Sequence, residues 1–105
     1  MSDNPIFKDI RNLIDANDIV LFMKGNARFP QCGFSATVVD ILQQYDIPFK
    51  DVNVLLDNEI RQGIKEFSDW PTIPQLYIKG EFIGGCDIVK EMHAADEIRT
   101  LLPAA

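Results

Sequence analysis

The sequence predicts an α/β fold in which a small mixed four-stranded sheet is flanked by helices on both faces. Short apolar runs typical of buried strands alternate with amphipathic helical stripes, and a turn-forming pair separates the last two runs. Hydrophobic residues make up 47% of the 105 residues and occur along the whole length. A chain of this size has room for one hydrophobic core, so we expect residues 1–105 to form a single domain.

The first half of the chain has the pattern of a helix followed by a strand, helix, strand unit. Asn4 and Pro5 suit the N-cap and first turn of a helix. The predicted elements are a helix over residues 5–15, a strand over 19–23, a helix from about 32 to before Pro48, and a strand over 49–54. Strands separated by such a helix form a parallel pair joined by a crossover.

The second half predicts a helix, a hairpin and a final helix. Asp57 is placed to cap the helix, although Gly63 within it weakens the pattern. Residues 76–78 and 82–83 flank Lys79-Gly80 and predict the hairpin, while Asp87 is placed to cap the final helix and Asp96 a further turn. The resulting order αβαβαββα is that of thioredoxin-like domains.

Charge and composition narrow the class of protein. The net charge of −6 repels polyanions, which argues against nucleic acid as a partner. The first residues show no export signal and the longest apolar run, residues 19–23, is too short to cross a bilayer, so we expect a cytoplasmic protein that binds no membrane. In such a compartment two cysteines are free thiols, and with one histidine they do not make a zinc site.

Cys32 is the candidate reactive group. It lies where the loop over residues 25–31 enters a predicted helix, beside unpaired backbone N–H groups and the positive end of the helix dipole. Lys24 and Arg28 add positive charge, and thiols in such places have lowered pKa values. The alternative interpretation is a small buried side chain without chemistry.

Three segments resemble the CGFS-type monothiol glutaredoxins, in the same order along the chain. They are Lys24-Gly25 with the run Pro30-Gln31-Cys32-Gly33-Phe34-Ser35, then Trp70-Pro71-Thr72-Ile73-Pro74-Gln75, then residues 80–88. The resemblance implies a thioredoxin-like fold and a site built around Cys32. Where a dithiol relative has a second cysteine this chain has Ser35, so an oxidised Cys32 needs an external thiol such as glutathione.

The resemblance also implies a cargo, a 2Fe-2S cluster. Such clusters ordinarily take four thiolate ligands, and this chain offers Cys32. The family's arrangement implies that Cys32 of each of two protomers and two glutathione molecules supply them, which makes a homodimer bridged by the cluster. A BolA-like partner in place of one protomer, and apo iron-sulfur proteins as acceptors, are implied by the resemblance alone.

Five residues are predicted to bind glutathione. By resemblance, Lys24 and Arg61 hold its glycine carboxylate; the alternative for each is a solvated surface charge. A cis Pro74 would expose the backbone of Ile73 to the cysteinyl part, as in strand addition, whereas a trans turn is the alternative. The backbone N–H groups of Cys86 and Asp87 suit the γ-glutamyl carboxylate. Asp87 has the second interpretation of an N-cap, and Cys86 that of a disulfide partner of Cys32.

Three functions are consistent with these residues. The leading one is a cluster carrier that transfers a 2Fe-2S cluster to apo-proteins. The second is a glutathione-dependent oxidoreductase that removes glutathione from protein mixed disulfides through Cys32, at most a weak enzyme because the seven-residue loop 25–31 displaces glutathione from an attack geometry. The third is an interaction module whose thiol is incidental.

Overall fold

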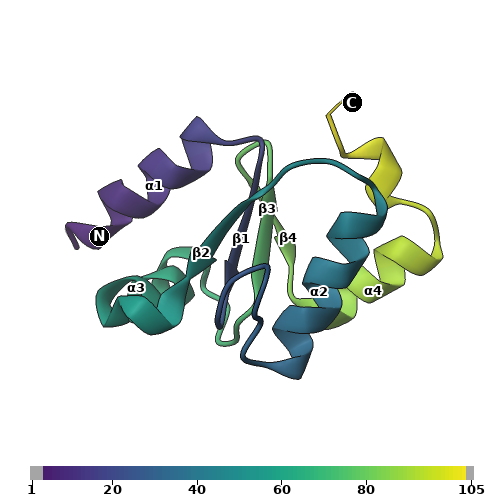
Figure 1. Ribbon diagram of the computed structural model, residues 1–105. Helices are drawn as coiled ribbons and strands as arrows, with labels where there is room; N and C mark the ends of the chain where they lie inside the picture. Colours follow the sequence, from purple (N-terminus) through teal and green to yellow (C-terminus); the bar gives the residue numbers. More distant parts are fainter. Residues whose placement is uncertain (1–3, 104–105) are drawn as a thin grey trace.

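The computed structural model describes residues 4–103 and contains a four-stranded mixed sheet between two pairs of helices (Figure 1). The elements are α1 (Ile6–Ala16), β1 (Ile19–Met23), α2 (Gly33–Gln44), β2 (Lys50–Asn53), η1 (Val54–Leu56), α3 (Asn58–Ser68), β3 (Gln75–Ile78), β4 (Glu81–Gly84), α4 (Cys86–Ala94) and η2 (Ile98–Thr100). The predicted α/β, thioredoxin-like architecture is confirmed. The helices of the first pair, α1 and α3, lie on one face, and α2 and α4 on the other.

The sheet has the strand order β2-β1-β3-β4. β1 lies in the interior, parallel to β2 and antiparallel to β3, and β4 pairs antiparallel with β3 as the second half of the hairpin. Lys79 and Gly80 form the hairpin turn with φ of +52° and +83°, the left-handed pair that a tight two-residue turn requires. β1 and β2 run parallel, so their carboxyl ends lie next to each other. The loop that leads to Cys32 begins at these strand ends.

The two faces of β1 supply two separate cores. Its five residues are all buried, as expected for a strand covered on both sides. Because side chains alternate along a strand, Val20 and Phe22 join the α1/α3 core, while Ile19, Leu21 and Met23 join the α2/α4 core. The apolar run that predicted this strand is therefore continuous because alternate side chains pack into two different cores.

Gly63 explains how α1 approaches α3. It is buried on α3, and a Cβ at this position would lie 2.5 Å from Cγ2 of Ile6 on α1. The glycine that weakened the helix prediction is therefore required by packing between two helices. Asp57 caps α3 as predicted, with its Oδ1 accepting from the backbone N–H groups of Glu59 and Ile60 at 2.9 and 3.3 Å.

Two predicted helix starts are wrong in detail. Pro5 is the N-cap residue of α1 rather than its first turn, and the Asn4 side chain accepts from the Ile6 N–H at 3.1 Å. Asp87 does not cap α4, because the helix begins at Cys86 after the N-cap Gly85, so Asp87 lies in its first turn. Within residues 4–103, no helix is long and apolar enough to cross a membrane.

Candidate functional site

A groove of about 590 Å³ lies where three segments meet: the start of α2, the stretch before β3 and the start of α4. The lining residues are Lys24, Cys32, Phe34, Lys65, Trp70, Pro71, Thr72, Ile73, Pro74, Gly85, Cys86, Asp87 and Ile88. All three segments that carry the sequence motifs contribute to it. The groove is thus the one place where the separated motifs meet.

Cys32 is the N-cap residue of α2 and is partly exposed in the groove. Its pKa is lowered, chiefly by the backbone N–H of Ser35; burial opposes this, and the Phe34 N–H, the Lys24 charge and the Ser35 hydroxyl lower it further. This is the chemistry that a helix N-terminus gives to a thiol. Cys32 is therefore a partly exposed thiol that is more acidic than an ordinary cysteine, and not a buried core side chain.

Ser35 is fully buried and structural. Its Oγ accepts a hydrogen bond from the backbone N–H of Lys24 at 3.1 Å, which ties the end of β1 to the first turn of α2. A second thiol is absent from this position, and the hydroxyl that replaces it positions Cys32 relative to Lys24. The site has a single nucleophilic sulfur at the motif, as the sequence indicated.

Cys86 lines the same groove as Cys32, and both are free thiols. Burial raises the pKa of Cys86, Asp87 and Cys32 raise it further, and Lys90 partly compensates. At neutral pH the thiolate fraction is therefore larger at Cys32 than at Cys86. The two sulfurs share a groove but differ in acidity.

Two cationic side chains, Lys24 and Lys65, line the groove. Lys65 lies on α3 one turn after Arg61, which is partly buried and does not line the groove. Sequence reasoning selected Arg61 and missed Lys65. The spacing of four residues on one helix face was the available signal.

The stretch before β3 forms one wall of the groove that Cys32 also lines. The Ile73–Pro74 peptide bond is cis, as the sequence predicted, and both residues are buried and line the groove. Gly85 lies against this wall, since a Cβ there would be 3.2 Å from the Pro74 carbonyl oxygen and 3.4 Å from Nε1 of Trp70. The start of α4 therefore approaches the wall closely because residue 85 has no side chain.

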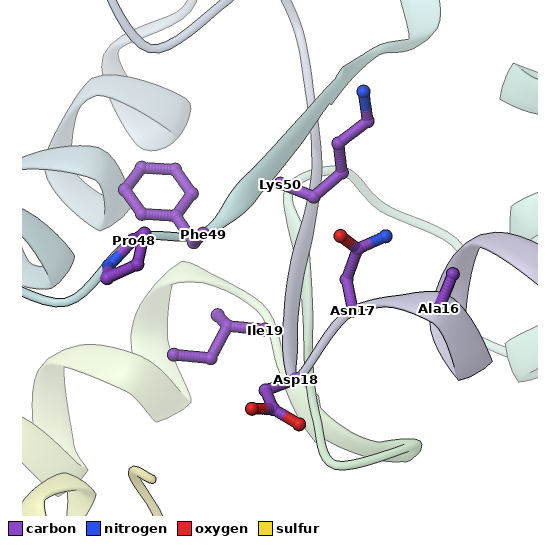
Figure 2. A pocket seen from close by; sticks show the side chains of 7 residues that line it. All are labelled: Ala16, Asn17, Asp18, Ile19, Pro48, Phe49 and Lys50. Atoms are coloured by element: carbon purple, nitrogen blue, oxygen red, sulfur yellow. The ribbon is translucent and has the colours of Figure 1, made fainter. Parts of the chain in front are cut away.

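A smaller hollow of about 370 Å³ lies at the opposite end of the sheet, where β1 and β2 begin (Figure 2). Asn17, Asp18 and Lys50 contribute its polar groups. Figure 2 shows the Asp18 carboxylate and the Lys50 ammonium pointing in opposite directions. The hollow lacks a thiol and convergent polar groups, so the chemistry is concentrated at the Cys32 groove.

The chain is similar to known proteins in both sequence and fold. Residues 19–83 match the glutaredoxin family. A probable monothiol glutaredoxin 2 of Rickettsia conorii is 53% identical over 104 residues, covering 99% of this chain and 97% of the relative. The solution structure of reduced apo GrxS14 from poplar is 49% identical with a TM-score of 0.80, covering 90% and 87% of the two chains. A wheat glutaredoxin crystal structure has a TM-score of 0.85 at 24% identity, covering 97% and 93%, which shows the fold alone.

Proposed function

This chain belongs to the glutaredoxin family, among its monothiol members, and from that premise we propose that it binds glutathione and carries a 2Fe-2S cluster to apo-proteins. The observation that carries the proposal is the Cys32 thiol, whose pKa is lowered at the start of α2, with the buried Ser35 where a dithiol enzyme has its second thiol. Its thiolate is a nucleophile and a soft-metal ligand.

Glutathione matches the charges around the groove. It has two carboxylates, one ammonium and an extended backbone, so its site needs cations at one end and N–H donors with an anion at the other. Lys24 and Lys65 supply cations, and Arg61 remains a predicted contact. The start of α4, with the backbone of Cys86 and the carboxylate of Asp87, supplies the other end, and the Ile73 backbone lies on the wall between them.

The cluster is cargo for which this chain supplies part of the ligand set. Cys32 contributes one thiolate, whereas the raised pKa of Cys86 makes it the poorer donor. Among the described residues no group of three or more His, Cys, Asp or Glu side chains is arranged around a metal site. Four thiolates would come from Cys32 of two protomers and two glutathione molecules, so we propose a cluster-bridged homodimer. A BolA-like partner and a cytoplasmic location are part of the same proposal.

A second candidate function is removal of glutathione from protein mixed disulfides. The accessible thiolate of Cys32 favours it, because attack on a disulfide sulfur requires a thiolate. Weak turnover in a mixed-disulfide assay together with robust cluster assembly supports the carrier. Turnover at the level of a dithiol glutaredoxin, lost in Cys32→Ser, would make the oxidoreductase the leading function.

Anaerobic reconstitution with iron and sulfide, with and without glutathione, tests the leading proposal. Absorption and native mass are measured on the wild type, Cys32→Ser and Cys86→Ser. We expect a glutathione-dependent cluster on a dimer of the wild type and of Cys86→Ser, and none on Cys32→Ser. A wild type that acquires no iron, sulfide or glutathione-dependent absorption would show that the chain is not a carrier.

A further inference from the structure

The loop over residues 25–31, which separates β1 from Cys32, is folded by polar contacts. Oδ1 of Asn26 accepts from the backbone N–H groups of Arg28 and Phe29 at 3.0 and 2.8 Å. Ala27 packs against the edge of the α2/α4 core, but the large ring of Phe29 is 64% exposed. Apolar burial therefore contributes little to holding this loop in place.

Two side chains of the edge strand β2 connect the loop to the sheet. Oδ2 of Asp51 accepts from the Ala27 N–H at 2.8 Å, and Oδ1 of Asn53 accepts from the Gly25 N–H at 3.0 Å. The same Asn53 oxygen accepts from the Leu55 N–H at 3.0 Å, so it also orders the turn after β2. A carboxylate that accepts from a backbone N–H makes a stronger bond than a neutral acceptor.

The loop joins two residues of the groove, Lys24 before it and Cys32 after it. The Lys24 carbonyl accepts from the Gln31 N–H at 2.9 Å, which closes the loop immediately before Cys32. The Lys24 N–H donates to the buried Ser35 Oγ in the first turn of α2. These bonds hold the Lys24 backbone at the start of α2, and the Asn53 contact fixes the next residue, Gly25, so the position of Lys24 beside Cys32 depends on both the loop closure and its anchors.

We infer that Asp51 and Asn53 are positioning residues that hold this loop so that Lys24 faces the Cys32 thiolate in the groove. Neither side chain lines the groove, so each acts through the loop backbone. The inference deepens the proposed function and rests on it, because the Lys24 charge affects both the reactivity of Cys32 and the binding of glutathione. Without these anchors, Gly25 and Ala27 lose their contacts with β2, and the Lys24 side chain is held less firmly beside the sulfur.

The test compares Asp51→Ala and Asn53→Ala with two matched variants in a Cys86→Ser background, where Cys32 is the remaining thiol. Asp51→Asn retains an oxygen acceptor, and Asp40→Ala removes an exposed carboxylate from α2 with the same change of charge. Alkylation of Cys32 by iodoacetamide is measured as a function of pH, together with calorimetric binding of glutathione. The alkylation readout does not require glutathione or a cluster.

Both alanine variants should alkylate about threefold more slowly at pH 7 and bind glutathione more weakly, because the fixed Lys24 charge favours the thiolate. Asp51→Asn should recover most of the rate, and Asp40→Ala should match the parent. Alanine variants that lose thermal stability but keep the parent pH profile of alkylation would overturn the inference. If one of the two alanine variants fails to fold, the alkylation profile of the other tests the inference. A parent that does not bind glutathione while the alkylation profiles shift as expected would overturn the proposed function and support the positioning role.

Discussion

Replacing Ser35 with alanine tests how the first turn of α2 sets the reactivity of Cys32. The substitution leaves the partly buried Lys24 N–H without its acceptor, which lies at 3.1 Å on the fully buried Ser35. A buried donor left without an acceptor costs about 1–2 kcal/mol, so the free energy of unfolding should fall by that amount. The variant also loses the hydroxyl that lowers the pKa of Cys32, while the backbone N–H groups of Ser35 and Phe34, which need no side chain, remain.

Two measurements on Ser35→Ala separate these effects. Urea unfolding gives the loss of stability, and the pH profile of Cys32 alkylation should move to higher pH while the thiol stays more acidic than an ordinary cysteine. Thr37→Ala is the matched control on the same helix, because its hydroxyl donates to the Gly33 carbonyl at 3.0 Å. This hydrogen bond is exposed to solvent, so the control should change stability by less than about 0.5 kcal/mol.

The outcome that refutes this reasoning is specific. A Ser35→Ala protein with the stability of Thr37→Ala and an unchanged alkylation profile would mean that the Ser35 hydroxyl neither satisfies Lys24 nor acts on the thiol. The lowered pKa of Cys32 would then come from the helix backbone and the Lys24 charge.

Three further predictions concern packing, pH and ligand binding. Gly63→Ala should lower the free energy of unfolding by about 1–2 kcal/mol in urea titrations, since its Cβ meets Ile6 at 2.5 Å and the clash outweighs alanine's helix propensity; an equally stable variant would contradict this packing. Burial raises the pKa of Tyr77 to about 12. Between pH 10 and 12 the unfolded state loses this proton and the folded state keeps it, so stability should fall by about 1–2 kcal/mol as pH rises, and a Tyr77→Phe variant with an equally steep fall in alkaline urea titrations would refute this. Lys65→Ala should weaken glutathione binding about tenfold in calorimetry, whereas Lys8→Ala on exposed α1 should not; equal affinities would remove Lys65 from the proposed site.

The sequence predicted the elements well because each has a local cause. The apolar run of β1, the Asp57 cap and the Lys79-Gly80 turn act over a few neighbouring residues, and the structure confirms all three. Helix boundaries were less predictable where two nearby residues could each serve as the N-cap. Gly85 rather than Asp87 is the N-cap of α4, because residue 85 packs against the wall before β3 and the helix starts directly after it.

Polar residues that act across the fold were harder to select from the sequence, although the spacing of Lys65 from Arg61 was a signal. Lys65 enters the groove only because α3 packs beside the stretch before β3. Asp51 and Asn53 look like ordinary polar residues of an edge strand, yet their oxygens hold a loop more than 20 positions earlier in the chain. Such contacts depend on the register between β1 and β2, which no local pattern specifies.

The sequence by itself determined the order of elements, the single thiol of the motif and the position of Cys32 at a helix start, because these follow from periodicity, capping and turn chemistry along the chain. The tertiary structure decided which groups surround that thiol. Ser35 became a buried acceptor for Lys24, Cys86 became a weakly acidic neighbour in the same groove, and Lys65 joined the cationic end. The physical reason is that desolvation and charge act through space, and only packing of the two helix layers on the sheet brings these side chains together.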